Sequence, residues 1–263
     1  MRGIIVYNEQ SLRINGFFAS KLKAELFALG AEVEVVTALP DYTPDFAVMR
    51  VYDEGINAHL DNLGVRTFNT STVAAICNDK WKTYELLNGG GIPVAPTVKA
   101  EIEDKITFPC VVKARHGHGG SEVFWAENED TFAEIKAKMT DSAIVQPPVG
   151  KRGKDLRVYV LNGEPIVGML RSSDKDFRSN FSLGGSASRY ELSKTEEQLV
   201  KKVASLISAD FVGIDFFLGD GGLICNELED VVGCRMVYTY TDIDIIKKFA
   251  EHIVCAVKMG KNA

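Results

Sequence analysis

An acidic residue inside an apolar strand constrains the fold of this chain more than any other feature. Asp215 lies within the apolar run 212–218, where an unpaired carboxylate would be costly. After the turn 219–222, which reads Gly-Asp-Gly-Gly, Glu227 and Glu229 share one face of a second strand because strand side chains repeat every two residues. Asp215 joins them only if residues 215 and 227 lie opposite each other, which requires an odd-length loop or a bulge. The hairpin predicts three hard oxygen ligands suited to Mg²⁺, with a solvated acidic face as the alternative.

A second feature is a strand that ends in a lysine and continues into a glycine-rich turn. Lys113 ends the apolar strand, and the following segment 114–121 contains Gly119, Gly120 and Ser121. Glycines let backbone N–H groups approach phosphate oxygens closely, and a lysine supplies a point charge. The pattern G-x-x-x-x-G-K-[ST] is absent, so the turn is not a Walker A loop. A phosphate-binding loop and a glycine-rich hairpin without function both remain open on this pattern alone.

Other polar residues near these features are less informative. His116 and His118 lie in the glycine-rich turn without matching Cys or carboxylate spacing, which disfavours a metal site there. Basic residues follow at 154–157, at Arg171 and at 176–180, between the glycine-rich turn and the acidic hairpin. They would either clamp phosphates or decorate surface hairpins, and their position does not decide between the two.

The order of the predicted elements sets the fold class. Strands at 3–7, 33–36 and 46–51 alternate with a helix that carries Phe18 and Leu22, so the front of the chain reads as a small α/β unit. Later strands are separated by glycine-rich turns and accompanied by a few amphipathic helices, one of which begins at an S-x-x-E capping box at 193–196. An α/β front followed by an α+β remainder is the predicted architecture.

Composition narrows the class of partner. The chain has 263 residues and a formal net charge of −6, which argues against nucleic acid as a partner because phosphate backbones select a basic face. No apolar run reaches the length of about 18 residues that a membrane span requires, so no membrane partner is expected. The five cysteines are widely spaced, which favours reduced thiols and a cytoplasmic protein.

Seven short motifs recur in the order of a known family. They are Asn78-Asp79-Lys80, Phe108-Pro109-Cys110-Val111-Val112-Lys113, His118-Gly119-Gly120, Asp155-Leu156-Arg157, Asp176-Phe177-Arg178-Ser179-Asn180, Gly213-Ile214-Asp215 and Asn226-Glu227-Leu228-Glu229. From about Asn69 to Ile253 the chain resembles the RimK-type, alpha-glutamate ligase-like branch of the ATP-grasp ligases. The resemblance implies an ATP-grasp fold that holds the nucleotide between two α+β subdomains. It divides the chain into an N-terminal α/β domain (1–78), a central lid subdomain with the glycine-rich loop (79–148) and a C-terminal subdomain with the metal site (149–263).

The resemblance also implies roles for single residues on the nucleotide side. Lys80 and Lys113 would contact the ATP phosphates, and the loop with Gly119, Gly120 and Ser121 would close over them. The hinge Gln146-Pro147-Pro148-Val149 would read adenine through the backbone, using the Pro147 carbonyl and the Val149 N–H, since proline lacks an N–H. The remaining nucleotide and metal contacts would come from Asp155 (ribose), Arg178 and Asn180 (the transferred phosphate), and Asp215, Glu227 and Glu229 (two Mg²⁺ ions, with Mn²⁺ as a substitute).

The reaction implied is the joining of a carboxylate to an amine through an acylphosphate. Arg171 would hold the acylphosphate or the substrate carboxylate, with Arg50 and Arg235 as weaker substrate candidates. The family usually reads E-x-N-x-x-P-G where this chain has Glu227 to Gly233, so Glu229 replaces an asparagine and the proline is missing.

Three functions therefore remain open. They are a ligase that adds an amino acid to a small molecule or peptide, a ligase that modifies a ribosomal peptide precursor, and an inactive nucleotide-binding protein. A homo-oligomer is compatible with each of them.

Overall fold

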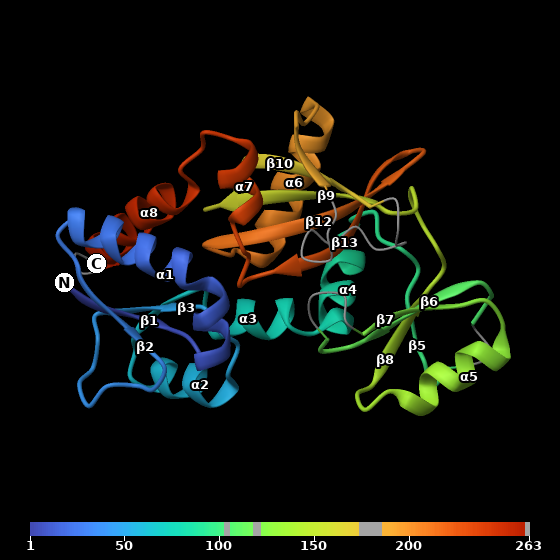
Figure 1. Cartoon of the computed structure of the whole chain (residues 1–263), viewed down its shortest axis with the longest axis horizontal. Coiled ribbons are helices and arrows are strands. Elements are labelled where there is room, and N and C mark those ends of the chain that lie inside the picture. Colours follow the sequence, from blue (N-terminus) through green and yellow to red (C-terminus); the bar gives the residue numbers. More distant parts are fainter. Residues whose placement is uncertain (103–105, 118–121, 174–185, 261–263) are drawn as a thin grey trace.

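A parallel sheet forms the N-terminal part of the molecule, shown in blue in Figure 1. The computed structural model describes residues 1–102, 106–117, 122–173 and 186–260. The sheet has the strand order β2-β1-β3-β4. Its elements are β1 (Arg2–Val6), α1 (Glu9–Ala28), β2 (Glu32–Val36), β3 (Phe46–Met49), α2 (Glu54–Asn62) and β4 (Arg66–Phe68). The chain passes from β1 to β2 on one side and then crosses to β3 on the other side of β1. The position between β1 and β3 is therefore a topological switch point.

A second sheet lies at the opposite end of the molecule, shown in green in Figure 1. Its strand order is β5-β8-β6-β7, all pairs are antiparallel, and α5 packs beside β7. The elements are β5 (Val98–Lys99), β6 (Cys110–Ala114), β7 (Val123–Ala126), α5 (Glu129–Lys138) and β8 (Ala143–Gln146).

The third sheet is also antiparallel, with the order β11-β10-β9-β12-β13. Its strands and the helices around it are β9 (Lys154–Leu161), β10 (Glu164–Ser172), β11 (Ser186–Tyr190), α6 (Lys194–Ile207), β12 (Phe211–Gly219), β13 (Gly222–Glu229), α7 (Arg235–Tyr240) and α8 (Ile245–Gly260). Two further helices, α3 (Ser71–Cys77) and α4 (Lys80–Gly89), lie between the sheets in Figure 1.

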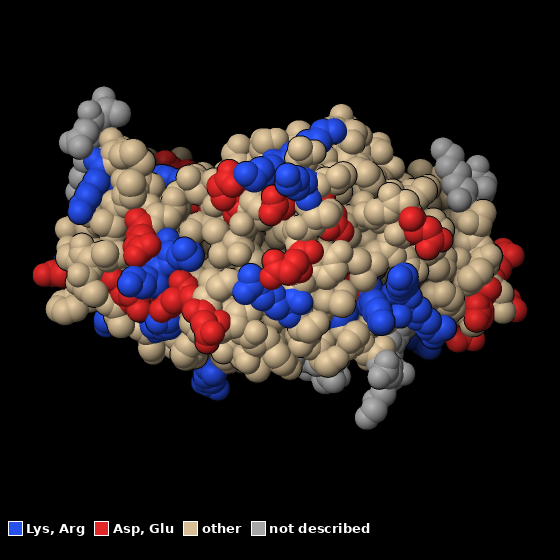
Figure 2. All heavy atoms as spheres, turned by 90° about the horizontal axis from the view of Figure 1, so that it is seen from above, with Lys and Arg blue, Asp and Glu red and all other residues tan. Residues whose placement is uncertain are grey.

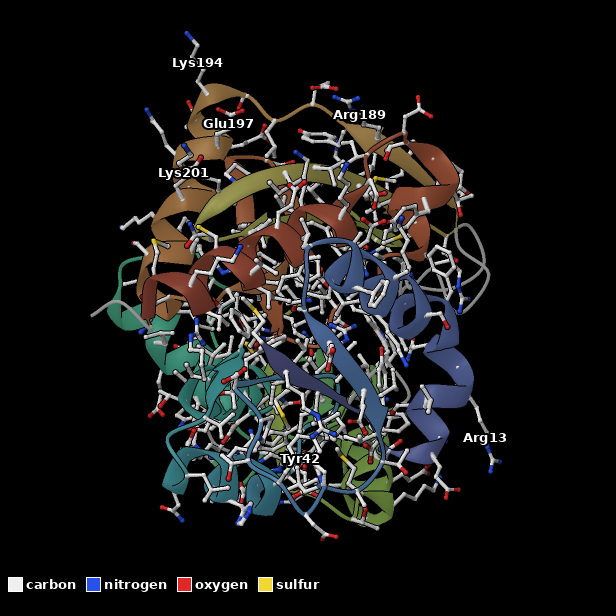
Figure 3. All side chains as sticks on the ribbon, turned by 90° about the vertical axis from the view of Figure 1, so that its left-hand side faces the viewer. Arg13, Tyr42, Arg189, Lys194, Glu197 and Lys201 are labelled. Carbon is white, nitrogen blue, oxygen red and sulfur yellow. The ribbon has the colours of Figure 1, made fainter. Side chains whose placement is uncertain are left out.

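Two apolar cores hold these layers together. In one, α8 packs on α1 and joins the N-terminal sheet to β9 and β10 through residues such as Phe68, Tyr159 and Phe249. In the other, α3, α4 and α6 pack on the third sheet, and α6 buries Val200 and Val203. The opposite face of α6 is solvated, and Lys194, Glu197 and Lys201 point outward in Figure 3.

The sequence predicted most of these elements. The α/β front and the α+β remainder are confirmed, as is the S-x-x-E capping box at the start of α6, where the Ser193 hydroxyl accepts from the Glu196 N–H at 3.3 Å. The helices α2, α3 and α7 were not predicted. The domain limits at 78/79 and 148/149 stay a prediction, although α4 shares its core with the third sheet rather than with the second.

The bulge that the acidic hairpin requires is present. Asp215 lies opposite Glu227, and the register shifts between Asp215 and Phe216. The prediction that residues 215 and 227 face each other is therefore confirmed.

Candidate active site

A cleft lies between the second and third sheets. The space between the two sheets, counted to the open mouth of the cleft and including solvent, is about 1040 Å³. The side chains that line it come from α4, β6, β7, β8, β9, β12 and β13, so segments far apart in the sequence meet there. The predicted residues among them are Lys80, Lys113, Gln146, Pro147, Val149, Asp155 and Glu227.

Two lysines and one carboxylate converge at one end of the cleft. Lys113 on β6 is only 6% exposed and donates to the side-chain oxygen of Asn226 at 2.8 Å. Lys80, the first residue of α4, lies 3.3 Å from a Glu227 carboxylate oxygen and also donates to the carbonyl of Gly117. Burial lowers the pKa of Lys113 to about 8, while the nearby carboxylate of Glu227 raises it. Positive charge is therefore concentrated where an anionic ligand can reach it.

Asp79 fixes the position of Lys80. Its carboxylate caps the N-terminus of α4 and receives two hydrogen bonds of 2.7 Å from the Arg115 guanidinium. The backbone N–H of Lys80 donates to the carbonyl of Arg115 at 3.0 Å, so α4 and the glycine-rich turn are joined directly. His116 in the same turn pairs with Asp141 at 3.0 Å, and no three metal-ligating side chains come together in the described ranges. Gly119, Gly120, Ser121 and His118 lie outside the described residues.

Aromatic and apolar side chains line the same cleft, and the Lys113 amine lies 5.5 Å from the centre of the Phe217 ring. Trp125 on β7 and Phe217 on β12 both face the cleft, and the Arg152 guanidinium lies 5.3 Å from the centre of the Trp125 ring. Sequence reasoning missed these two aromatic residues and Asn226. The Asn226 position beside the acidic pair was visible in the sequence, whereas the aromatic residues carry no motif.

The hinge after β8 also borders the cleft. Gln146 is buried and donates to the Thr97 hydroxyl at 2.9 Å, while Pro147 and Val149 are partly exposed to the cleft. Gly150 follows with φ +70°, and a Cβ there would lie 2.8 Å from the Phe217 Cβ. Only glycine allows the hinge to pass this close to β12.

A row of ion pairs crosses the third sheet beside the lysines. Arg157 on β9 donates two hydrogen bonds of 2.7 Å to Asp215 and also contacts the Glu229 carboxylate. Arg171 on β10 donates to Asp215 at 2.7 Å and forms a two-bond pair with Asp155. Burial opposes the charge of Asp215, but the two guanidinium groups outweigh it and hold its pKa well below the usual range.

Asp155, Arg171 and Asp215 form ion pairs with one another or with Arg157. The family resemblance instead implies contacts of these residues with the ribose, the substrate and the metal. Asp155 lines the cleft but is 4% exposed and bound to Arg171, and Arg171 is also 4% exposed with its guanidinium held by two carboxylates. The Asp215 side chain is directed to Arg157 and Arg171 rather than to the cleft. The physical reason is that a buried carboxylate in an apolar strand must be paired, and long arginines on the neighbouring strands reach it.

The residues that remain suit one hard cation. Glu227 and Glu229 share a face of β13, and their side chains are 33% and 39% exposed. Mg²⁺ in nucleotide sites is bound by one or two carboxylates together with substrate phosphates. These two glutamates fit that requirement, whereas both oxygens of Asp215 accept hydrogen bonds from arginines.

The carboxyl end of the parallel sheet contacts the segment that follows β13. Arg50 follows β3, is 3% exposed, donates to the Val232 carbonyl at 2.9 Å and stacks on Phe18. Within the described residues, the Nε of Arg50 and the hydroxyl of Tyr7 are buried without a hydrogen-bond partner. Burial raises the pKa of nearby Asp230 to about 6, opposed by a hydrogen bond from Asn78. Arg235 begins α7 and is exposed, and Arg178 and Asn180 lie outside the described residues.

Comparison with known proteins identifies the family. The profile of the RimK-like ATP-grasp domain matches residues 77–253, which span the cleft and both of its sheets. The chain belongs to the RimK-like ATP-grasp family. The predicted resemblance is confirmed, and so is the predicted fold class.

Relatives and solved structures agree with this membership. The chain is 30% identical to beta-citrylglutamate synthase B of Mus musculus over 98% of its own length and 69% of that protein. It is 31% identical to the alpha-aminoadipate–LysW ligase LysX of Sulfurisphaera tokodaii over 65% of each chain. The fold is similar to that of D-alanine–D-alanine ligase from Bacillus anthracis, with a TM-score of 0.79, 14% identity and coverage of 100% of this chain and 99% of that one.

No helix within the described ranges is long and apolar enough to cross a membrane. On the face shown in Figure 2, acidic and basic side chains are interspersed rather than gathered into one basic surface.

Proposed function

We propose that this RimK-like ATP-grasp ligase uses ATP to activate a carboxylate as an acylphosphate, which an amine then attacks to form an amide. Membership of the family makes the chain an ATP-dependent carboxylate–amine ligase. The observation that carries the proposal is the cleft, which is lined by Lys80, Lys113 and Glu227 and by the aromatic rings of Trp125 and Phe217. A nucleotide needs both environments, cations for its phosphates and an apolar slot for its base.

The residues of the cleft divide the work of holding ATP. The base packs against the aromatic side chains, and the hinge residues Pro147 and Val149, which also line the cleft, offer it a backbone carbonyl and a backbone N–H. Lys80 and Lys113 hold phosphate oxygens, since both amines lie at the end of the cleft beside Glu227. Glu227 and Glu229 would hold Mg²⁺, which would supply positive charge next to the phosphates. Phosphoryl transfer of this kind depends mainly on alignment and on fixed positive charge.

The arginines beside the acidic residues have a different role. Arg157 lies between Asp215 and Glu229, and Arg171 lies between Asp155 and Asp215. We assign Arg157 to holding Glu229 in place beside Glu227. Arg171 positions Asp215 and Asp155, which in turn hold the sheet face in place.

We place the part of the site that binds the substrate carboxylate at the switch point of the parallel sheet. Arg50 would bind a substrate carboxylate there, because its buried guanidinium has a backbone carbonyl as partner and a free Nε. By their names, three relatives are a synthase of beta-citrylglutamate, a synthase of N-acetylaspartylglutamate and a ligase of alpha-aminoadipate and LysW. An amino acid added to a small molecule or to a peptide is therefore the proposed reaction, in a cytosolic protein that is free to form homo-oligomers.

One assay tests the proposal. Purified protein with ATP and Mg²⁺ is offered pooled amino acids and short peptides, and both ADP and new masses are followed. We expect ADP release that depends on the substrate pool, with one product mass larger than its acceptor by an amino acid residue. Tight binding of ATP without any substrate-dependent ADP would exclude the ligase and favour the inactive nucleotide-binding protein.

A product mass found only on a peptide of a ribosomal precursor would instead favour the second predicted function. The solved ligase PsnB in complex with its minimal precursor has this fold, with a TM-score of 0.71 at 16% identity.

A further inference from the structure

A turn at the mouth of the cleft carries three basic side chains, which no function has been assigned so far. Lys151, Arg152 and Lys154 lie between the hinge and the start of β9, and all three are exposed and line the cleft. Within the described ranges, no ion pair joins any of them to a carboxylate. We call residues 151–154 the basic turn.

Backbone hydrogen bonds hold the basic turn in place. The Lys154 N–H donates to the Lys151 carbonyl at 3.1 Å, and Gly153 between them has a φ of +69°. A positive φ at the third position of a four-residue turn is typical of type II, which favours glycine there. The Gly153 carbonyl in turn accepts from the Ser173 N–H at 2.8 Å, just after β10. The basic side chains therefore extend from a backbone that is fixed to the third sheet.

Arg152 reaches from this turn to the opposite wall of the cleft. Its guanidinium carbon lies 5.3 Å from the centre of the Trp125 ring, which belongs to β7 of the second sheet. A cation–π contact positions a guanidinium without neutralising its charge. A ligand that enters between the two sheets therefore passes close to a fixed positive charge.

The charges of the cleft as a whole are positive on balance. Its charged lining consists of five basic and three acidic residues, namely Lys80, Lys113, Lys151, Arg152 and Lys154 against Glu122, Asp155 and Glu227. The paired groups next to this lining, Arg157 and Arg171 with Asp215 and Glu229, add two charges of each sign. The chain itself carries −6. The cleft is thus a positive region of an acidic protein, and its exposed part is the basic turn.

We propose that the basic turn attracts anionic nucleotides to the mouth of the cleft and raises the rate constant of their association. The inference rests on the proposed function, since the ligand is the nucleotide. A nucleotide keeps a net negative charge even as its Mg²⁺ complex, and a cleft lined by one sign of charge can raise association rates by tenfold or more. Charges at a rim act chiefly on association, whereas charges buried in a site act chiefly on dissociation.

The position of the turn favours a nucleotide over an acidic acceptor substrate. The turn follows Gly150 of the hinge, which packs against Phe217 in the slot assigned to the base. The substrate carboxylate is instead assigned to Arg50, on the N-terminal sheet. The sequence left open whether the basic residues at 154–157 bind phosphate or decorate the surface. Lys154 belongs to the basic turn, whereas Arg157 belongs to the buried ion pairs.

The rate of nucleotide entry tests the proposal without any turnover. The chain is mixed with the non-hydrolysable analogue AMPPNP and Mg²⁺ in a stopped-flow instrument, and the fluorescence of Trp125 in the cleft is followed. Association and dissociation rate constants are measured at ionic strengths of about 0.02 M and 0.5 M, because the screening length falls from roughly 20 Å to roughly 4 Å between them. Calorimetry measures the affinity in the same samples.

A double variant removes two charges of the turn. Lys151→Gln with Arg152→Gln should lower the association rate constant by roughly three- to tenfold at low ionic strength and leave the dissociation rate constant within about twofold. At high ionic strength its association rate constant should lie within about twofold of that of the unmodified chain. Both side chains are exposed, and circular dichroism confirms that the variant is folded.

A matched control removes the same net charge elsewhere. Lys247→Gln with Lys248→Gln changes two exposed lysines of α8, which lies at the other end of the molecule from the second sheet (Figure 1). Neither residue lines the cleft. The association rate constant of this variant should stay within about twofold of the unmodified value at both ionic strengths.

An unchanged association rate constant in the turn variant would overturn the inference and leave the proposed function intact. So would an equal loss in the α8 variant, or a loss that persists at high ionic strength or appears only in dissociation. An unmodified chain that binds no AMPPNP by calorimetry would overturn the proposed function, and the inference with it.

Discussion

The lysines and the arginines of the site are largely shielded from solvent, yet their surroundings differ. Lys113 has a neutral amide oxygen as its hydrogen-bond partner, and Lys80 has one carboxylate at 3.3 Å. Arg157 and Arg171 each lie between two carboxylates. The lysine region therefore keeps positive charge for a ligand, whereas the arginine region is neutralised within the protein. We conclude that the first binds phosphate and that the second is chiefly a scaffold.

Removing the central carboxylate of the arginine region should have the largest effect. Asp215→Ala leaves two buried guanidinium groups without a shared partner, and breaking a buried pair costs about 3–5 kcal/mol. We expect the free energy of unfolding, measured by urea denaturation, to fall by that amount. The exposed control Glu191→Ala should change it by no more than about 1 kcal/mol. Equal effects in the two variants would mean that the arginine region is not a scaffold.

Removing the central cation of the lysine region should act on the ligand instead. Lys113→Met keeps an apolar stem of similar length but deletes the charge. The loss of a charge-assisted contact, about 2–3 kcal/mol, corresponds to an ATP affinity weaker by roughly 10²-fold. Calorimetric titration measures it, with the exposed Lys247→Met as the control. Unchanged affinity in the Lys113 variant would mean that the phosphates bind elsewhere.

The pH dependence of binding sharpens the same point. Burial lowers the pKa of Lys113 to about 8, although Glu227 raises it. The charged form binds phosphate, so affinity is complete below pH 8 and is lost as the pH rises through this value, by up to about tenfold per pH unit. Titrations with ATP between pH 7 and 9.5 measure the loss. Lys113→Arg stays charged in this range, and a decline of equal size in that variant would assign the pH dependence to another group.

The smallest effect is expected at the hinge. Gly150 and Gly163 both have positive φ, +70° and +81°, but a Cβ at 150 would lie 2.8 Å from Phe217 whereas a Cβ at 163 meets nothing within 4 Å. Alanine at either position should lower stability by about 1 kcal/mol through backbone strain. Only Gly150→Ala should also weaken ATP binding, by a few-fold, because the hinge is displaced from β12. Equal affinities in the two variants would separate the hinge from the nucleotide.

The sequence was most informative where a pattern is local. Strand alternation and the turn 219–222 predicted the acidic hairpin with its bulge, and the capping box predicted the start of α6. Ordered motifs predicted Lys80, Lys113 and the hinge, which all line the cleft.

Side-chain pairing across strands was beyond prediction. Arg157 and Arg171 lie on different strands from Asp215, and the pairing depends on sheet order, register and rotamers that one-dimensional spacing does not contain. For the same reason, Trp125 and Phe217 could not be assigned to one cleft.

The most direct test of the comparison is an ATP titration of two matched variants. Lys113→Met and Arg171→Met each replace one buried cation of the site by the same apolar side chain. The account predicts that Lys113→Met loses roughly 10²-fold in affinity with near-normal stability, whereas Arg171→Met loses stability and keeps its affinity within a few-fold. The reverse pattern, with affinity lost at Arg171 and kept at Lys113, would contradict it.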